Sequence, residues 1–242
     1  MSKIAVITDS NAHFLPQEAK ELGISIVPMP FTIDNETFYE DITLTRDEFY
    51  QRMESGASIA TSQPSPSDVM SAWDKALETN DEVVYIPMSS GLSGSCQSAR
   101  MLAMEYDGKV EVVNNQRISV TLKRSVLDAI ELAQRGMTAA QIREELERVR
   151  YESSIYIMLD TLHYLKKGGR ITPAAAAIGS LLRIKPVLQI KGERLDAFSK
   201  ARTISQGKNI MINAMKHDIE TLYGGTDSET VWLYAVHGNV PE

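Results

Sequence analysis

Three short segments carry the residue types that hold small anions in proteins. They are residues 8–10 (Thr-Asp-Ser), 61–65 (Thr-Ser-Gln-Pro-Ser) and 89–95 (Ser-Ser-Gly-Leu-Ser-Gly-Ser). Glycine lets a backbone approach a ligand closely, and a helix N-terminus offers free N–H groups with a partial positive charge. Together with the hydroxyls, these groups predict a site for a carboxylate or a phosphate. The alternative is that they are turn and cap residues, because Ser, Gly and Asp are common in turns and caps.

The 89–95 segment also admits an enzymatic interpretation. It lacks the Lys of a P-loop and the glycine spacing of a dinucleotide fingerprint, so it does not predict a nucleotide site. A serine hydrolase or transferase would use Ser89 or Ser93 as its nucleophile and would need a base beside it. Among the four histidines only His237, at the end of a predicted strand, is well placed, and no Gly-x-Ser-x-Gly elbow precedes a helix. The enzyme therefore stays as the rival hypothesis.

The remaining charged candidates are isolated in the sequence. Asp9 has no partner at metal-ligand spacing and could equally cap a helix, so no metal is predicted. Arg170 lies in a basic turn and Arg202 precedes a helix. Each arginine is either solvated or in contact with an anion or a partner protein. The small-then-large apolar series over residues 174–184 either packs a helix or lines a tunnel for an apolar tail.

Strands and helices alternate through residue 149, which predicts βαβ units and a mostly parallel sheet. In such a sheet ligands bind at the carboxyl ends of the strands, and each of the three segments lies where a strand or a loop meets a helix. Apolar β-branched runs indicate the strands, and capping residues indicate the helix starts. The predicted strands are residues 4–8, 25–33, 37–39, 82–88 and 109–113; the predicted helices are 16–22, 45–55, 65–78, 96–106, 121–134 and 139–149.

The pattern changes after residue 150. Strands are predicted at residues 154–159, 186–190, 195–198 and 231–236, with a basic turn at 166–170 and helices at 173–182 and 203–222. This order predicts an α+β domain with an antiparallel or mixed sheet. The fold class is therefore α/β, with a mostly parallel N-terminal domain over residues 1–150 and an α+β domain over 151–242.

Composition excludes several classes of protein. The 242 residues carry a net charge of −7, which argues against a nucleic-acid partner. The single cysteine, Cys96, excludes an internal disulfide framework and a cysteine-based zinc site. The sequence opens without a secretory leader and contains no stretch of about 20 apolar residues. We therefore expect a cytoplasmic protein without stable membrane insertion.

The motifs taken together resemble the DegV family. They occur in the family's order over nearly the whole chain, at residues 7–10 (Ile-Thr-Asp-Ser), 61–65, 89–95, 165–171 (Leu-Lys-Lys-Gly-Gly-Arg-Ile), 184–188 (Ile-Lys-Pro-Val-Leu) and 201–203 (Ala-Arg-Thr). The family comprises bacterial fatty-acid-binding proteins that serve as the binding subunit of fatty acid kinase. The resemblance implies a long-chain fatty acid between the two domains, with its tail in an apolar tunnel.

The resemblance also implies roles for individual residues. The hydroxyls of Thr61 and Ser93 would hold the carboxylate, with the backbone N–H groups of Ser62 and Gly94, and Arg170 would lie near the head group. The full set of candidate ligand-binding residues is Asp9, Ser10, Thr61, Ser62, Ser93, Gly94, Ser95 and Arg170.

The resemblance implies a partner as well. A separate kinase subunit would phosphorylate the bound carboxylate, and the acyl-phosphate would pass to phospholipid synthesis. Arg202 would belong to the surface that meets this kinase. The chain itself would do no catalysis and need no cofactor. A protein that senses lipid and regulates another protein is a further alternative.

Three departures from the family pattern stand out. Residues 114–121 (Asn-Asn-Gln-Arg-Ile-Ser-Val-Thr) lack the glycines that the family has in this turn, and Ser95 replaces the usual Thr. The family's closing His-x-Gly-Pro-Gly segment, whose histidine bonds the carboxylate, does not precede Glu242. His237 matches an internal His-Gly segment instead. We expect a truncated C-terminal domain, or weakened head-group binding if Glu242 is the natural end.

Overall fold

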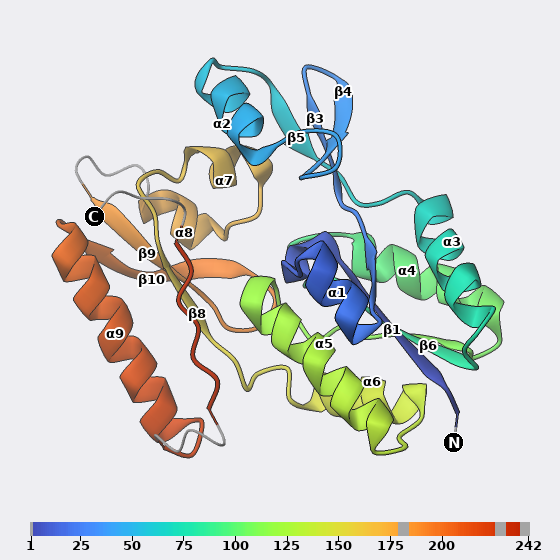
Figure 1. Ribbon diagram of the computed structural model, residues 1–242. Helices are drawn as coiled ribbons and strands as arrows, with labels where there is room; N and C mark the ends of the chain where they lie inside the picture. The colour runs from blue at the N-terminus through green and yellow to red at the C-terminus, as the bar shows by residue number, and fades with distance from the viewer. Residues whose placement is uncertain (1, 179–183, 226–230, 238–242) are drawn as a thin grey trace.

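The computed structural model describes residues 2–178, 184–225 and 231–237, and the side chain of Ile178 is not described. Its first sheet consists of β1 (Ile4–Asp9), β2 (Ser25–Val27), β6 (Glu82–Ile86) and β7 (Val110–Val112). All neighbours are parallel, in the order β2-β1-β6-β7 (Figure 1). The central strands β1 and β6 are mostly apolar, as expected where both faces of a sheet are buried.

Helices cover the two faces of this sheet. The helices that pack on one face are α1 (Pro16–Leu22), α5 (Ser119–Gln134) and α6 (Ala139–Arg148); those on the other are α3 (Pro66–Leu77) and α4 (Ser95–Ala103), which continues into a 3-10 turn, η2 (Met104–Tyr106). Alternate β6 residues belong to the two cores, Val84 to the first and Tyr85 to the second. This arrangement confirms the predicted α/β class and the parallel sheet.

A small lobe interrupts the parallel sheet between β2 and α3. It contains β3 (Pro30–Ile33), β4 (Glu36–Tyr39) and β5 (Ile59–Thr61), antiparallel in the order β4-β3-β5, with α2 (Arg46–Glu54) beside them (Figure 1). The prediction of one strand over residues 25–33 is therefore wrong. Pro28 and Pro30 flank Met29 and lack the N–H donors that a continuous ladder needs, so the chain leaves one sheet and enters another.

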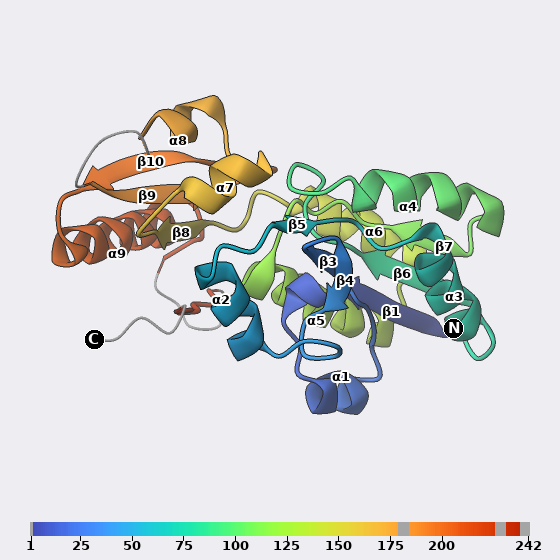
Figure 2. The ribbon, with the colours of Figure 1, turned by 90° about the horizontal axis from the view of Figure 1, so that it is seen from above.

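The second half is built on an antiparallel sheet, as predicted. Its strands are β8 (Ile155–Met158), β9 (Lys185–Ile190) and β10 (Leu195–Ala201), in the order β10-β9-β8. Helix α9 (Ile204–Thr221) covers one face, and α7 (His163–Gly168) and α8 (Pro173–Ile178) lie on the other (Figures 1 and 2). The basic turn predicted at 166–170 is wrong in part, because α7 continues to Gly168 and only Gly169 is left-handed.

The strand predicted at residues 231–236 is absent: residues 231–237 belong to no helix or strand. Alternating Val, Leu and Tyr favour a strand, but a strand forms only where a neighbouring edge accepts its hydrogen bonds. Here the Trp232 ring instead lies against α5, with the Arg124 guanidinium 4.2 Å from the ring centroid. Residues 179–182 of the helix predicted at 173–182 lie outside the described part of the chain.

One apolar cluster joins the two halves. It contains Val84 and Leu92 from the first half and Ala175, Leu188 and Leu195 from the second. The division into domains at residue 150 stays a prediction, since the core is continuous across it.

Candidate functional site

The carboxyl edge of the parallel sheet gathers the three segments singled out in the sequence. Strand β1 ends at Asp9, and β6 leads through Met88 into residues 89–95, which we call the 89–95 loop. The segment over residues 61–65, the 61–65 loop, begins at the last residue of β5 and leads into α3. Parallel strands end at a common edge, so the topology of this sheet brings residues 8–10 and the 89–95 loop together, whereas the 61–65 loop arrives from the antiparallel lobe sheet.

Asp9 is fully buried and fixes the start of the 89–95 loop. One carboxylate oxygen accepts from the Met88 N–H at 2.7 Å, and the other accepts from the Asn11 N–H and side-chain amide, each at 2.9 Å. Burial raises the pKa of Asp9, and these hydrogen bonds oppose the rise. Asp9 caps the 3-10 turn η1 (Ser10–Ala12), which agrees with the alternative of a cap.

Ser10 is likewise engaged with the protein, because its hydroxyl accepts from the Met29 N–H at 3.1 Å. Both residues therefore hold backbone around the edge of the sheet. A direct contact of Asp9 or Ser10 with a ligand stays a prediction.

The 89–95 loop makes a compact turn into α4. The N–H groups of Leu92 and Ser93 both donate to the Ser89 carbonyl, at 3.0 and 3.1 Å. The Ser93 hydroxyl accepts from the Ser95 N–H at 3.2 Å, and Gly94 occupies the N-cap of α4. The Ser95 hydroxyl is buried and has no hydrogen-bond partner in the described part of the chain. The free N–H groups of the first turn of α4 suit a negative charge here.

Gln63 joins the 61–65 loop to the 89–95 loop. Its side-chain amide exchanges hydrogen bonds with the Ser98 hydroxyl of α4, at 3.0 and 3.2 Å. Its Oε1 also lies 3.1 Å from the position that a Cβ on Gly94 would take. The sequence analysis did not single out Gln63, although it lies within the motif. Its amide sets the two loops side by side, which spacing alone did not predict.

Thr61 and Ser62 stand at the exposed end of β5. Thr61 pairs with Phe31 in the lobe sheet, and the Ser62 N–H donates to the Pro30 carbonyl at 3.3 Å. A ligand that uses the Ser62 N–H would compete with this long bond. Thr61 is an exposed residue, and its proximity to Ser93 stays a prediction.

The two predicted arginines form their hydrogen bonds within their own segments of the chain. Arg170 follows α7, and its guanidinium donates to the Gly168 carbonyl of the same turn. Arg202 is exposed just before α9, where its N–H donates to Gln206 Oε1 at 2.8 Å. Since α7 and α9 lie on opposite faces of the second sheet, the two arginines serve different surfaces (Figure 2).

Ser89 does not have the environment of a nucleophile. It is fully buried, and its hydroxyl donates to the Glu193 carbonyl at 2.8 Å. Within the described residues no hydrogen bond joins a serine hydroxyl to a histidine ring. An activated serine needs such a base, so the geometry gives the hydrolase hypothesis no support.

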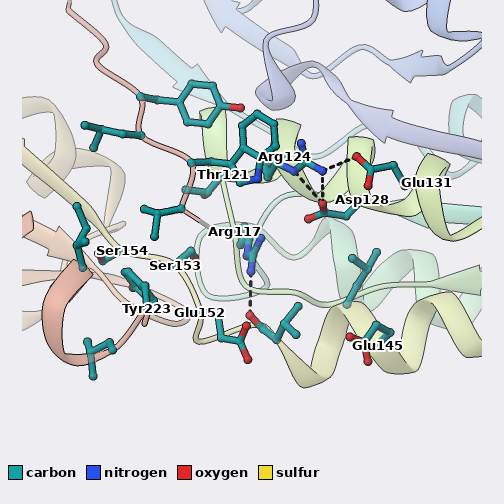
Figure 3. Close-up of a pocket in the computed structure, with 18 of the residues that line it drawn as sticks. Arg117, Thr121, Arg124, Asp128, Glu131, Glu145, Glu152, Ser153, Ser154 and Tyr223 are labelled. Atoms are coloured by element: carbon teal, nitrogen blue, oxygen red, sulfur yellow. Dashed lines mark hydrogen bonds and ion pairs between the residues drawn. The ribbon is translucent and has the colours of Figure 1, made fainter. Parts of the chain in front are cut away.

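A cavity of about 640 Å³ lies on the other side of the first half, between α5, α6, α9 and residues 231–234 (Figure 3). Arg117 lines it, 5% exposed, donating to the Ser125 hydroxyl at 3.1 Å and the Val149 carbonyl at 2.8 Å. Arg124 pairs there with Asp128 and Glu131, at 2.5 and 2.7 Å. None of the predicted ligand residues lines this cavity, so it is distinct from the loop edge.

Across residues 2–178, 184–225 and 231–237, no three His, Cys, Asp or Glu side chains gather as a metal would require. None of the described helices combines the length and apolar character needed to cross a membrane. Cys96 is buried, and burial raises the pKa of its thiol to about 11.

Comparison with known proteins decides the family. A sequence model described as "Uncharacterised protein, DegV family" matches residues 3–240. The chain belongs to the DegV family. A DegV domain-containing protein of Deinococcus radiodurans is 36% identical over 200 residues, which cover 82% of this chain and 71% of the relative.

Solved DegV structures share the fold. A DegV family protein from Thermus thermophilus, described by its fatty acid binding, superposes with a TM-score of 0.83 at 34% identity and covers 90% of this chain and 79% of its own. A stearic-acid-binding protein from Eubacterium ventriosum superposes with a TM-score of 0.80 at 25% identity, covering 91% and 77% of the two chains.

One departure from the DegV pattern has a visible structural outcome. Residues 114–121 lack the family's glycines, yet Gln116 and Ser119 both adopt left-handed backbone, each with φ of 57°. This conformation is strained for residues with a Cβ and is held by surrounding contacts. Residues with a Cβ therefore supply the left-handed conformation in this turn.

Proposed function

We propose that this DegV protein binds a long-chain fatty acid, with its carboxylate at the 61–65 and 89–95 loops and its tail between the two halves. The observation that carries the proposal is the contact of the two loops through Gln63, at the N-terminus of α4. Hydroxyls of Thr61 and Ser93, together with the Gly94 N–H, would hold the carboxylate. Fatty acid binding by the Thermus and Eubacterium proteins supports the ligand class.

An apolar cluster that includes a residue of the 89–95 loop supports the place of the tail. Leu92, within the 89–95 loop, belongs to the same cluster as Ala175, Leu188 and Leu195 of the second half. An acyl chain that inserts beside Ser93 and between these residues would leave water, and each buried methylene contributes about 0.8 kcal/mol. A carboxylate head and an apolar tail would thus use the polar edge of one half and the apolar core of both.

We infer a carrier role for the bound acid. In this proposal a separate kinase subunit phosphorylates the carboxylate, Arg202 belongs to the docking surface, and Arg170 approaches the head group. The support is the exposure of both arginines and the absence of a predicted nucleotide loop in the sequence. The chain then acts in the cytoplasm as a binding subunit and does no chemistry itself.

The first experiment is lipid extraction from the purified, denatured protein followed by mass spectrometry. Long-chain fatty acid should be recovered from the wild type and lost from a Thr61→Ala, Ser93→Ala double variant. A displacement assay with fluorescent stearate should show at least about a tenfold weaker affinity, because two charge-assisted hydrogen bonds are removed.

The matched control is Thr37→Ala, Ser205→Ala, which removes the same hydroxyls from exposed positions elsewhere. It should retain lipid. Equal affinities of both double variants for stearate would show that the two loops are not the head-group site. Acyl-phosphate formation with ATP and the kinase subunit tests the carrier role, and a protein that only senses lipid would yield none.

A further inference from the structure

The first three residues of the 89–95 loop contact the second half of the protein rather than the 61–65 loop. Ser89 is fully buried, and its hydroxyl donates to the Glu193 carbonyl at 2.8 Å while it accepts from the Gly91 N–H at 3.3 Å. Glu193 lies in the turn between β9 and β10. This hydrogen bond joins residues 104 positions apart in the sequence.

Gly91 is required by this contact and not by its own conformation. Its backbone is outside the left-handed region, so alanine is sterically allowed in the isolated loop. A Cβ on Gly91 would, however, overlap the Glu193 carbonyl oxygen and lie 2.6 Å from the Glu193 Cβ. The β9–β10 turn therefore seats directly on the Gly91 backbone.

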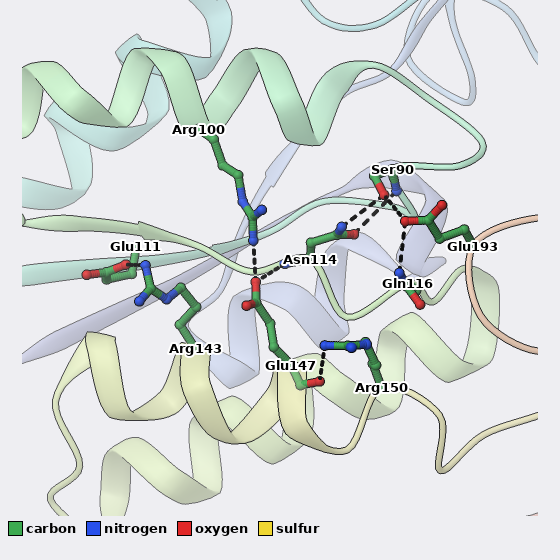
Figure 4. Close-up of polar contacts among 9 residues, drawn as sticks. All are labelled: Ser90, Arg100, Glu111, Asn114, Gln116, Arg143, Glu147, Arg150 and Glu193. Carbon is green, nitrogen blue, oxygen red and sulfur yellow. Dashed lines mark hydrogen bonds and ion pairs between the residues drawn. The ribbon is translucent and has the colours of Figure 1, made fainter.

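Side chains around the contact continue it into the first half (Figure 4). Glu193 Oε1 accepts from the Gln116 amide at 2.9 Å and from the Ser90 hydroxyl at 3.4 Å, and Ser90 Oγ accepts from the Asn114 amide at 2.9 Å. The Asn114 N–H in turn donates to Glu147 of α6 at 2.8 Å. Glu193 is exposed, so water screens its carboxylate. The buried hydrogen bond from Ser89 to the Glu193 carbonyl therefore contributes most of the attachment between the turn and the loop.

Ser89 connects this contact to the candidate head-group position. Its hydroxyl holds the β9–β10 turn, and its carbonyl accepts the N–H groups of Leu92 and Ser93. Displacement of the turn would move the same residue that orients the backbone of Ser93. The two ends of the Ser-rich loop are therefore mechanically linked through Ser89.

We propose that Ser89-Ser90-Gly91 and the β9–β10 turn form a latch between the two halves, and that this latch positions Ser93 and Gly94 for the ligand carboxylate. The inference rests on the proposed fatty-acid function for its ligand. Ser89 and Gly91 are positioning residues, and the 89–95 loop divides into a docking part and a ligand part. Opening the latch separates the halves that enclose the acyl chain, so it should act mainly on ligand dissociation.

The test compares Gly91→Ala and Ser89→Ala with Ser205→Ala, which removes an exposed hydroxyl from α9. Stopped-flow release of fluorescent stearate should be at least about tenfold faster in Gly91→Ala, and faster in Ser89→Ala, because the turn no longer seats or is no longer bonded. Amide hydrogen exchange should rise at Leu92 and Ser93 in both variants and stay unchanged in β6.

The outcomes separate the latch from the function. If the wild type binds no stearate, the proposed function fails, and faster exchange at Leu92 and Ser93 in the variants still supports the latch. If the wild type binds stearate and both folded variants release it at the wild-type rate with unchanged exchange, the latch is overturned and the function stands. If Gly91→Ala does not fold, Ser89→Ala decides by the same two measurements.

Discussion

The two larger sheets of the molecule are attached to their helices by different interactions. In the first half, Val83, Val84, Tyr85 and Ile86 of β6 are all fully buried between helices on both faces. In the second half every residue of β8 is half-buried, and α9 is joined to it by a polar contact, in which the Tyr156 hydroxyl donates to Asp218 at 2.7 Å. Lys191 also lies 3.7 Å from the Asp218 carboxylate.

This difference has a physical consequence. Apolar burial is non-directional and depends little on pH, so it suits a frame that must hold loops at fixed positions. A polar contact depends on geometry and protonation, and it is worth less when water reaches it. The first half therefore supplies the rigid edge that carries the ligand loops, while the link between α9 and the strand β8 in the second half includes a polar contact that responds to conditions.

Truncation of the buried aromatic core in the first half should have the largest effect. Trp73 is fully buried, with edge-to-face contacts to Tyr85 and Tyr106 at 5.6 and 5.3 Å between ring centroids. Trp73→Ala should lower the free energy of unfolding by about 3–5 kcal/mol, measured by chemical denaturation, because it leaves a large cavity. Met101→Ala on the exposed surface of α4 is the control and should change little. A similarly small loss of stability in Trp73→Ala and Met101→Ala would contradict the conclusion that apolar burial holds the first half together.

Removal of the buried carboxylate in the first half should have an intermediate effect that grows at acid pH. Asp9→Ala leaves the Met88 N–H and the Asn11 donors without their acceptor, at a cost of about 1–3 kcal/mol. The pKa of Asp9 is raised by burial, so its contribution to stability falls as pH rises from about 3.9 through the folded-state pKa. Wild type should therefore gain stability on acidification relative to the variant.

Denaturation midpoints measured between acid and neutral pH test this dependence. The exposed Asp47→Ala variant provides the baseline for general acid effects. A difference between wild type and Asp9→Ala that shrinks on acidification would contradict the sign derived from the burial of Asp9.

Loss of the polar contact in the second half should have the smallest effect. We expect a modest fall in the free energy of unfolding and a change in how that free energy depends on pH in the alkaline range. Tyr156→Phe removes the donor to Asp218, and we expect a loss of about 1 kcal/mol after screening by solvent. Burial, followed by Asp218, raises the pKa of Tyr156. Its stabilisation is therefore complete below about pH 10 and is lost as pH rises above that value.

The alkaline branch of the stability profile measures this contribution. Wild type should lose stability above the unfolded-state pKa more steeply than Tyr156→Phe, with exposed Tyr50→Phe as the control. Equal alkaline slopes in all three proteins would show that α9 is held by apolar contacts, as in the first half.

Local signals in the sequence predicted most of the elements. Thr45 and Glu48 form the capping box that starts α2, and Thr138 and Gln141 form the one that starts α6, as their spacing indicated. Continuous apolar runs predicted β1 and β6, since buried parallel strands need apolar residues on both faces. These features depend on neighbours within a few residues, which the sequence displays directly.

Long-range contacts were not predictable in the same way. Residues 25–33 fulfil the composition of one strand, yet they divide between two sheets, and residues 231–236 have strand character without a paired edge. Gln63 and Glu193 lie in predicted loops and turns, where local propensity does not reveal which distant backbone each will contact.

The sequence by itself determined the α/β class, the order of most elements and two of the polar segments, residues 8–10 and 89–95, that follow strands of the parallel sheet. It did so because helix caps, buried strands and turns depend on short local patterns of polarity and side-chain shape. Only the tertiary structure decided that Gln63 joins the 61–65 loop to the 89–95 loop and that Ser89 and Gly91 receive the β9–β10 turn. Those contacts depend on how the two halves pack, and close packing selects partners by position in space rather than by distance along the chain.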